Sequence, residues 1–340
     1  MAGTSLALDY AQPIPSLQRL LQISQRTQWN VDQIDWTRGV SDSDYLPILG
    51  WHGALRSAYL RAQPHGKQEQ VARLFVAYEF SQILHGEQGA MMLAGQLINS
   101  VDDLDAKLFA ATQAKDEARH VGAVRSLIGR MGPIYPIGAL LKQTLDALLV
   151  CDLWPKQVLG LQLFLEARAL LSFREHSLFV TDPVFREVVG NIERDESQHV
   201  AFGIQHLKTG IDALTAEQRK ELVSYGTWLD RHLWTLIRAE DYRMIFEECD
   251  LDYDEYLLTM GPPSKLRPDM TPAQKKSNDL MYQTFERWFF SSLLRVGLSE
   301  VAHQAAADRQ RPVDDTLLTM DPAAIAEVLP WAKPLADPGG

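Results

Sequence analysis

The chain carries one pattern of acidic residues and histidine twice, and this repeat limits its fold more than any other feature. Residues 87–120 and 166–199 each begin with a glutamate and end in Asp-Glu-x-x-His, with 30 positions separating the two glutamates. A gapless alignment also pairs Asp103 with Asp182, Lys107 with Arg186 and Val121 with Val200. Four carboxylates and two imidazoles in this order form the ligand set of a two-metal centre in a four-helix bundle: Glu87, Glu117, His120, Glu166, Glu196 and His199.

The spacing within each copy follows from helix geometry. Residues three apart on an α-helix lie about 60° apart around its axis, so the glutamate and histidine of each Glu-x-x-His project from one face. Each motif can therefore offer a carboxylate and an imidazole to one ion, and a carboxylate from a neighbouring helix completes the site. Four buried carboxylates repel one another strongly, and two divalent cations remove that cost. Oxygen and imidazole ligands without thiolate suit iron or manganese and also permit zinc.

A single Glu-x-x-His is a weak signal, and the chain contains a third one for comparison. Glu300 and His303 have the same spacing, but Ser299 replaces the preceding aspartate, and the position thirty residues upstream is Met270. We predict that this third pair is exposed or structural. The alternative for the other six residues is surface charge on amphipathic helices. The strongly apolar sequences beside the first glutamate of each copy argue against that alternative.

Composition excludes several classes of partner. The 340 residues are 46% hydrophobic, enough for one large core or two modest ones. The net charge of −11 argues against a nucleic-acid surface, which needs a basic stripe. The two cysteines, Cys151 and Cys249, imply no disulfide framework. No signal peptide and no membrane span is apparent, so we expect a cytoplasmic protein.

Apolar periodicity predicts helices almost throughout and no strand of consequence. We divide the chain into an N-terminal helix and irregular segment (1–66), a metal-binding four-helix bundle (67–210), and accessory helices with a frayed tail packing on that bundle (211–340). Bundle helices are predicted over about 68–98, 102–131, 154–179 and 183–209, with an apolar crossover helix at 136–150. Further helices are predicted at 14–26, 215–247, 253–259 and 272–306, with a loop at 261–268. The tryptophans of the irregular segment are predicted to be packing anchors: Trp29, Trp36 and Trp51.

The duplicated motif resembles the ferritin-like di-iron carboxylate superfamily over residues 68–209. It is similar in style to ribonucleotide reductase small subunits and to the hydroxylase subunits of bacterial multicomponent monooxygenases. Residues 116–120 fit the Asp-Glu-x-Arg-His form common in the second group, whereas the second copy has Gln198 at the arginine position. The resemblance implies an all-α, ferritin-like four-helix bundle with a long crossover and additional N- and C-terminal helices.

The resemblance also implies a role for each residue of the motif. It implies two irons bridged by Glu117 and Glu196, one completed by Glu87 and His120, the other by Glu166 and His199. Asp116 and Asp195 would accept the outer N–H of a ligand histidine and so fix its tautomer.

Two branches of the superfamily fit less well. Reductase small subunits place a radical tyrosine four residues beyond the first motif histidine, where this chain has Val124, and its last tyrosine is Tyr282. A radical-generating role is therefore disfavoured, except for the manganese–iron relatives that lack the tyrosine. Ferritins are shorter, and the 130 residues after Gly210 argue against iron storage.

These observations predict a non-heme di-iron oxygenase or oxidase that uses dioxygen to hydroxylate, N-oxygenate or desaturate a small organic substrate. Two alternatives stay open: a manganese–iron or di-iron oxidase similar to the reductase small subunit, and a non-enzymatic iron-handling or structural protein. The chain has no dinucleotide-binding fingerprint and no iron–sulfur cysteine cluster, so an external reductase, ferredoxin or small molecule would supply electrons. We expect a homodimer without nucleic-acid or membrane partners.

Other polar residues compete less well for a role at the metals. Glu79 lies two turns before Glu87 and is the main rival ligand, but its counterpart in the second copy is Val158. The pocket beside the metals is expected to be lined from the ligand-bearing helix faces by Ile83, Met91, Ala94, Leu163, Leu170 and Phe173. A structural role is predicted for His85, His176, Arg174 and His206.

Overall fold

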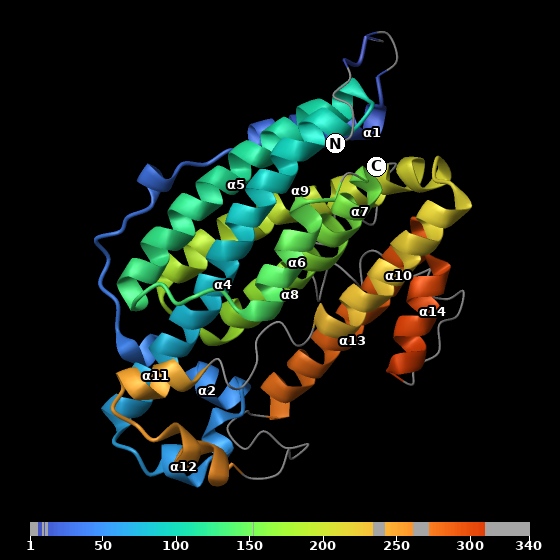
Figure 1. The fold of residues 1–340 in the computed structure, drawn as a ribbon. Helices are drawn as coiled ribbons and strands as arrows, with labels where there is room; N and C mark the ends of the chain where they lie inside the picture. The colour runs from blue at the N-terminus through green and yellow to red at the C-terminus, as the bar shows by residue number, and fades with distance from the viewer. Residues whose placement is uncertain are drawn as a thin grey trace.

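The computed structural model describes residues 6–8, 10, 13–151, 153–233, 242–260 and 272–309. Within these ranges the fold is all-α, as predicted, and the β-type pairing is limited to an isolated antiparallel bridge between Ser57 and Met260. A ferritin-like bundle of four long helical segments occupies the centre of the molecule (Figure 1): α4 (His65–Ser100), α5 (Leu104–Met131), the segment 154–179 and α9 (Pro183–Asp212). None of the described helices is both long and apolar enough to cross a membrane.

The bundle is built from two helical hairpins joined by a long crossover. Helices α4 and α5 lie side by side in opposite directions, joined by residues 101–103 (Figure 1). The segment 154–179 and α9 form the second hairpin, joined by residues 180–182. Between the hairpins, residues 132–153 cross over and carry α6 (Ala139–Leu149), which packs on α4. The predicted crossover helix is therefore present.

Two hairpin ends show why the helices stop and start where they do. Helix α9 begins at Pro183, as predicted, and the Asp182 side chain accepts a hydrogen bond from the backbone N–H of Val184 at 2.8 Å. Helix α5 ends at Gly132, where a Cβ atom would lie 2.7 Å from a side-chain carbon of Leu74 on α4. A larger residue there would require the end of the Leu74 side chain to move.

The third bundle segment is a continuous helical rod with a π-helical centre. Helix α7 (Trp154–Val158) leads into the π-helix η4 (Leu159–Glu166) and then into α8 (Ala167–Phe179). Segments of this kind are rare and are found frequently at functional sites. The sequence analysis predicted an ordinary α-helix over 154–179. Because a π-turn holds an extra residue, the side chains of η4 point in directions that a period of 3.6 does not predict.

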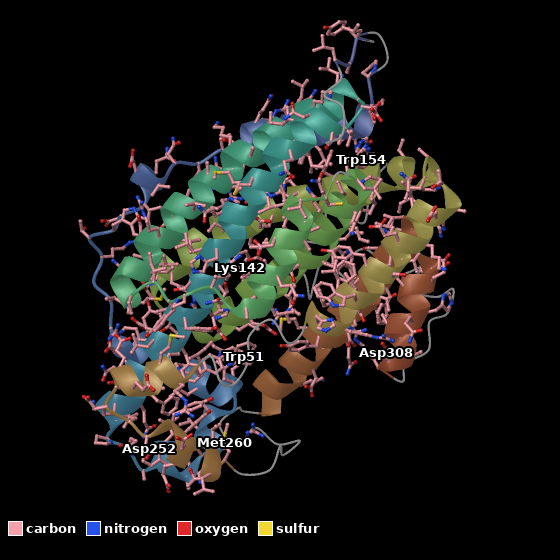
Figure 2. All side chains as sticks on the ribbon, in the orientation of Figure 1. Trp51, Lys142, Trp154, Asp252, Met260 and Asp308 are labelled. Carbon is pink, nitrogen blue, oxygen red and sulfur yellow. The ribbon has the colours of Figure 1, made fainter. Side chains whose placement is uncertain are left out.

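Accessory helices cover both ends and one side of the bundle. Helix α1 (Pro15–Arg26) packs on α5 and α9, while α10 (Ala216–Leu233), α13 (Pro272–Arg295) and α14 (Ser299–Asp308) cover the side of η4 and α8 (Figure 1). The short helix η1 (Val31–Gln33) packs on α5. At the other end lie the short helices η2 (Asp42–Asp44), α2 (Pro47–Trp51), η3 (Ala54–Arg56), α3 (Ala58–Arg61), α11 (Arg243–Glu248) and α12 (Tyr253–Leu258). Trp51 lies there, where α2 meets α4 and α8, and its ring stacks on Phe179 (Figure 2).

The predicted single helix over 272–306 is wrong in one respect. The chain forms two helices there, α13 and α14, because Gly297 between them adopts a φ of +87°, in the left-handed region that an α-helix does not use. The predicted helix over 215–247 corresponds to α10 and α11, and its middle lies outside the described residues. The predicted loop at 261–268 and the C-terminal tail also lie outside them.

The core of the described residues consists of two large apolar clusters with a polar layer between them, and a small third cluster of Ala90, Leu93, Leu148 and Leu161. One cluster joins α1, α10, α13 and α14 to the bundle and contains Phe109, Phe164 and Phe202. The other gathers the short helices around the opposite end and contains Phe80 and Phe185. Between them the bundle buries a layer of charged and amide side chains that includes all six predicted ligands. This layer is where the fold requires a compensating partner.

Candidate metal centre

The six predicted ligand residues converge at the middle of the bundle. They form two groups of four, in which one atom from each residue lies within 4.8 Å of the others: Glu87, Glu117, His120 and Glu196 in the first group, and Glu117, Glu166, Glu196 and His199 in the second. Each of the four bundle segments contributes at least one ligand, and all six side chains are buried. The described residues can therefore hold two metal ions side by side.

The two glutamates of the Glu-x-x-His motifs belong to both groups. The two carboxylate oxygens of Glu117 lie 3.2 Å from Nδ1 of His120 and 3.2 Å from Nδ1 of His199. The oxygens of Glu196 lie 3.0 and 3.4 Å from the same two nitrogens. Each carboxylate thus extends from one imidazole to the other, which is the placement that bridging two ions requires.

Each histidine turns Nδ1 toward the ligand carboxylates and Nε2 away from them. Nε2 of His120 donates to Oδ2 of Asp195 at 3.1 Å, and Nε2 of His199 lies 3.6 Å from Oδ2 of Asp116. The two aspartates therefore face the outer nitrogens of the motif histidines, and each faces the histidine of the opposite motif. A carboxylate in that place keeps the proton on Nε2 and leaves Nδ1 free to bind an ion.

One arginine connects the two aspartates. Nη2 of Arg119 donates to Asp116 at 2.7 Å and to Asp195 at 2.7 Å. This double contact explains why the second motif has Gln198 where the first has Arg119. Both aspartates are already paired with Arg119, so a second arginine would have no aspartate to neutralise. Gln198 instead donates to the side chain of Thr27 at 3.2 Å and so ties α9 to the end of α1.

Sequence reasoning missed the contribution of the N-terminal segment. Nε1 of Trp29 donates to Oδ2 of Asp195 at 2.7 Å, and its ring stacks on His120 with centroids 6.4 Å apart. Gln28 donates to Asp116 at 3.0 Å, and Ser24 does so at 3.3 Å. Trp29 was predicted only as a packing anchor. Nothing in its local sequence indicates the aspartate 166 positions away.

A pair of buried amides was also missed. Nε2 of Gln113 donates to Glu166 at 2.7 Å and to Glu117 at 3.1 Å. Its side-chain oxygen accepts from Nε2 of Gln162 at 3.1 Å. Gln113 and Gln162 each lie four residues before a ligand glutamate, which is a signal that could have suggested a shared helix face.

The charges of the metal-free centre are balanced by protons. Burial, followed by the nearby Glu196 carboxylate, raises the pKa values of Glu87 and Glu166 well above the ordinary range. Burial also opposes a charge on His120, but hydrogen bonds to Asp195 and Glu117 prevail and raise the pKa of its ring well above the usual value. These protons occupy the places that cations would take.

Several buried polar atoms of the centre have no hydrogen-bond partner among the described residues. They are Oε2 of Glu166, both carboxylate oxygens of Glu196 and both ring nitrogens of His199. Buried polar atoms are normally paired, so this concentration in one layer calls for a further binding partner. A pair of divalent cations with oxygen and imidazole ligands fits these atoms, and iron and manganese have that preference.

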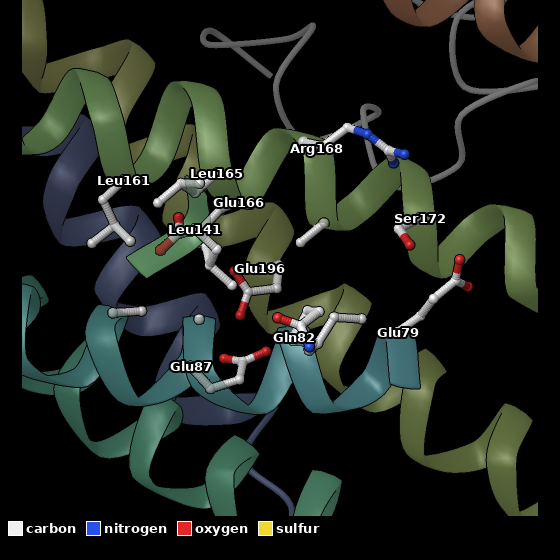
Figure 3. A pocket seen from close by; sticks show the side chains of 14 residues that line it. Glu79, Gln82, Glu87, Leu141, Leu161, Leu165, Glu166, Arg168, Ser172 and Glu196 are labelled. Carbon is white, nitrogen blue, oxygen red and sulfur yellow. The ribbon is translucent and has the colours of Figure 1, made fainter. Parts of the chain in front are cut away.

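A pocket with mainly apolar walls opens beside the centre. Figure 3 shows Glu87, Glu166 and Glu196 directed into it from its wall. Of the predicted lining residues, Ile83 is present, and the other apolar lining side chains are Ala90, Leu141, Leu161, Leu165 and Ala169. The other predicted lining residues do not line it: Met91, Ala94, Leu163, Leu170 and Phe173. Leu163 and Leu170 pack in the apolar core instead. Leu163 lies within the π-helix, whose wider turn changes which of its residues share a face with Glu166.

The competing residues have other partners. Glu79 belongs to neither four-residue group: one oxygen accepts from Nε2 of His176 at 2.7 Å, and the other accepts from the Tyr242 hydroxyl at 3.1 Å. The third Glu-x-x-His is at the surface, as predicted, where Glu300 pairs with Arg219 and His303 is exposed.

Comparisons with known proteins give similar folds at low sequence identity. No protein-family model matches the chain, and no curated protein sequence does. A dimanganese(II) NrdF of Streptococcus sanguinis is 13% identical, with 88% of this chain and 99% of that chain covered and a TM-score of 0.48. A putative class I ribonucleotide reductase of Bacillus halodurans is 11% identical, with 87% and 99% covered and a TM-score of 0.49.

A third similar structure is an R2-like ligand-binding oxidase with an aerobically reconstituted Mn/Fe cofactor. It is 15% identical to this chain, with 78% of this chain and 94% of that chain covered and a TM-score of 0.46. The two-metal site of the present protein is defined by its own ligand geometry.

Proposed function

We propose that the protein is a non-heme di-iron, dioxygen-dependent oxidoreductase that oxidises a small organic substrate by hydroxylation, N-oxygenation or desaturation. The observation that carries the proposal is the pair of four-residue groups that share Glu117 and Glu196 and face a largely apolar cavity. A closed core around the same ligands would instead have favoured an iron-handling or structural role.

The proposed coordination follows from the contacts of each side chain. Glu117 and Glu196 would be shared by the two ions, Glu87 and His120 would complete one position, and Glu166 and His199 would complete the other. Iron in both positions, or a manganese–iron pair, would supply the electrons that reduce dioxygen.

The remaining residues position the ligands and exclude water. Asp195 and Asp116 keep each imidazole directed at the ions through its outer nitrogen. Leucines from α6 and η4 line the cavity beside the carboxylates, so that a reactive oxidant is kept from bulk solvent. The substrate would lie in this cavity, against the side of the centre formed by Glu87, Glu166 and Glu196.

The chain needs a separate source of electrons for repeated turnover. Its two cysteines cannot hold an iron–sulfur cluster, and its sequence has no dinucleotide-binding fingerprint. We therefore propose an external donor, either a reductase or ferredoxin or a small-molecule reductant.

The first test is metal content after anaerobic loading with ferrous iron and removal of unbound metal. Two irons per chain, followed by an optical change when dioxygen is admitted, would support the proposal, and retention of one ion or none would contradict it. Parallel loading with equal manganese and iron tests the alternative metal pair, since selective retention of one ion of each would replace the all-iron form.

A pocket variant tests whether an organic substrate is oxidised in the cavity. Ala169→Phe places a ring in the lining and is expected to prevent turnover of any substrate found in a screen, with two irons still bound. Ala111→Phe, at an exposed position of α5, is the control. Equal turnover by both variants would place the substrate elsewhere.

A further inference from the structure

We infer that Gln113 makes the two metal positions chemically unequal, because it donates a hydrogen bond to one oxygen of Glu166 and so favours the other oxygen for an ion. The inference rests on the proposed metal centre, but it concerns the difference between the two positions rather than the reaction. It is carried by a chain of hydrogen bonds among fully buried or nearly fully buried side chains: Gln162, Gln113, Glu117 and Glu166.

The Gln113 amide uses both of its hydrogens on ligand carboxylates. Nε2 lies 2.7 Å from Oε1 of Glu166, at the short end of the range for an N–H···O bond. It lies 3.1 Å from Oε1 of Glu117. Oε1 of Glu166 accepts this short hydrogen bond, whereas Oε2 has no hydrogen-bond partner among the described residues. Oε2 is therefore the oxygen of Glu166 that is more available to an ion.

The orientation of this amide is determined by its other end. The oxygen of Gln113 accepts from Nε2 of Gln162 at 3.1 Å, and a flipped amide would turn that oxygen toward two carboxylates. Gln162 lies in η4, and Gly203 of α9 packs directly on it: a Cβ at Gly203 would lie 2.7 Å from the Cβ of Gln162. The close helix contact and the π-helix together hold Gln162 in place.

Glu87, the counterpart of Glu166 in the first repeat, has no such restraint. The contact found for its carboxylate in the described part of the chain is with Nδ1 of His120, at 3.3 Å, a nitrogen that would itself bind the ion. Both oxygens of Glu87 are therefore available to an ion.

The aligned repeats differ in sequence at the positions that cause this difference. The gapless alignment of the two copies pairs Gln113 with Ile192 and Gln162 with Ile83. Ile192 is fully buried, and Ile83 lines the cavity. The bundle thus has two amides beside one outer ligand and two apolar side chains at the corresponding places beside the other. An ion held with Glu166 has fewer protein oxygens than an ion held with Glu87.

Cobalt(II) titration without oxygen tests this difference, because cobalt(II) absorbs visible light more strongly as its coordination number falls. Two variants report one position each: Glu87→Ala leaves the Glu166 position, and Glu166→Ala leaves the Glu87 position. We expect the Glu87→Ala protein to give the more intense spectrum. Gln113→Met keeps the side-chain volume but removes the hydrogen-bond donors. Combined with Glu87→Ala, it should weaken the visible spectrum. Combined with Glu166→Ala, it should leave the spectrum nearly unchanged. Equal spectra for the two single-position variants would overturn the inference.

A symmetrised variant provides a second route if Gln113→Met does not fold. Gln113→Ile with Gln162→Ile installs the residues of the other repeat at both places. When both substitutions are made in the otherwise wild-type chain, the ratio of the two stepwise cobalt affinities should fall by about tenfold. This is the scale on which contacts to ligands affect metal affinity. Unchanged stepwise affinities and an unchanged spectrum would show that the amides do not distinguish the positions.

These measurements separate the inference from the proposed function. Fewer than two cobalt ions bound to the wild-type chain would contradict both. Two ions bound with no effect of either glutamine variant would contradict the inference alone, because neither dioxygen nor an organic substrate takes part.

Discussion

Oδ2 of Asp195 lies 3.1 Å from Nε2 of His120, so an acidic residue of the second motif contacts the histidine of the first. The reverse pair, Asp116 and His199, is 3.6 Å apart. Since α5 and α9 each supply one aspartate and one histidine, each helix orients the imidazole of the other. The two motifs are therefore coupled, and a substitution on either helix should affect metal binding at both positions.

Trp29→Phe removes one of the hydrogen bonds that hold Asp195 in place. We expect metal affinity to fall about tenfold, the lower end of the range for residues that support a ligand, because Asp195 then holds His120 less firmly. Trp36→Phe is the matched control, since its Nε1 donates to the backbone oxygen of Val31 away from the centre. Equal metal affinities in calorimetric titration of the two variants would contradict the prediction.

Arg119→Leu removes the cation between two buried aspartates. Breaking a buried ion pair by removing one partner costs about 3 to 5 kcal/mol, because the remaining charge is left uncompensated. We expect a loss of this order in the free energy of unfolding of the metal-free protein, measured with chemical denaturant. Arg125→Leu, exposed on the same helix, should change it by less than about 0.5 kcal/mol.

Glu117→Ala and Glu196→Ala each remove a carboxylate that both four-residue groups share. Each variant should retain at most one ion per chain, with helical content by circular dichroism close to that of the wild type. Glu300→Ala changes the exposed third motif and should retain two ions. Full metal content in either Glu117→Ala or Glu196→Ala protein would mean that the bridging assignment is wrong.

Metal affinity should fall as the pH is lowered. The pKa values of Glu87, Glu166 and the two motif histidines are raised, so these groups keep their protons to higher pH than free side chains do, and they must lose them to bind an ion. Binding therefore releases protons and strengthens as the pH rises. Calorimetry in two buffers of different ionisation enthalpy measures the number released, and identical apparent enthalpies would contradict the prediction.

Gly203→Ala introduces a methyl group at the contact between α9 and η4. The added carbon would lie 2.7 Å from Gln162 and Leu163 side-chain atoms, so the helices must separate, at a cost of about 1 to 3 kcal/mol in the free energy of unfolding. Gly190→Ala on the same helix meets no atom within 4 Å and should stabilise the protein by up to about 1 kcal/mol. A stabilised Gly203→Ala protein would contradict the close contact.

The sequence alone predicted the all-α bundle, its crossover and the residues that meet at its centre. It could do so because the spacing of two residues along an α-helix determines the angle between their side chains. A glutamate and a histidine three residues apart therefore share a face, and the repeat supplies the same face twice. The pair Glu300 and His303 was predicted to be exposed or structural because no matching glutamate lies thirty residues before it, and it lies at the surface.

The contacts that orient the ligands depend on tertiary structure. Trp29 reaches Asp195, Gln113 reaches Glu166, and each aspartate faces the opposite histidine only because of how the helices are rotated and spaced against one another. The π-helix also depends on tertiary structure. The wider turn of η4 changes the direction of Leu163, which was predicted to line the cavity and packs in the core instead. Met91 and Ala94 of the regular helix α4 were predicted to line it as well and do not, so helix period alone did not determine the lining. Spacing along one helix determines which side chains share a face, whereas the packing between helices determines what that face meets.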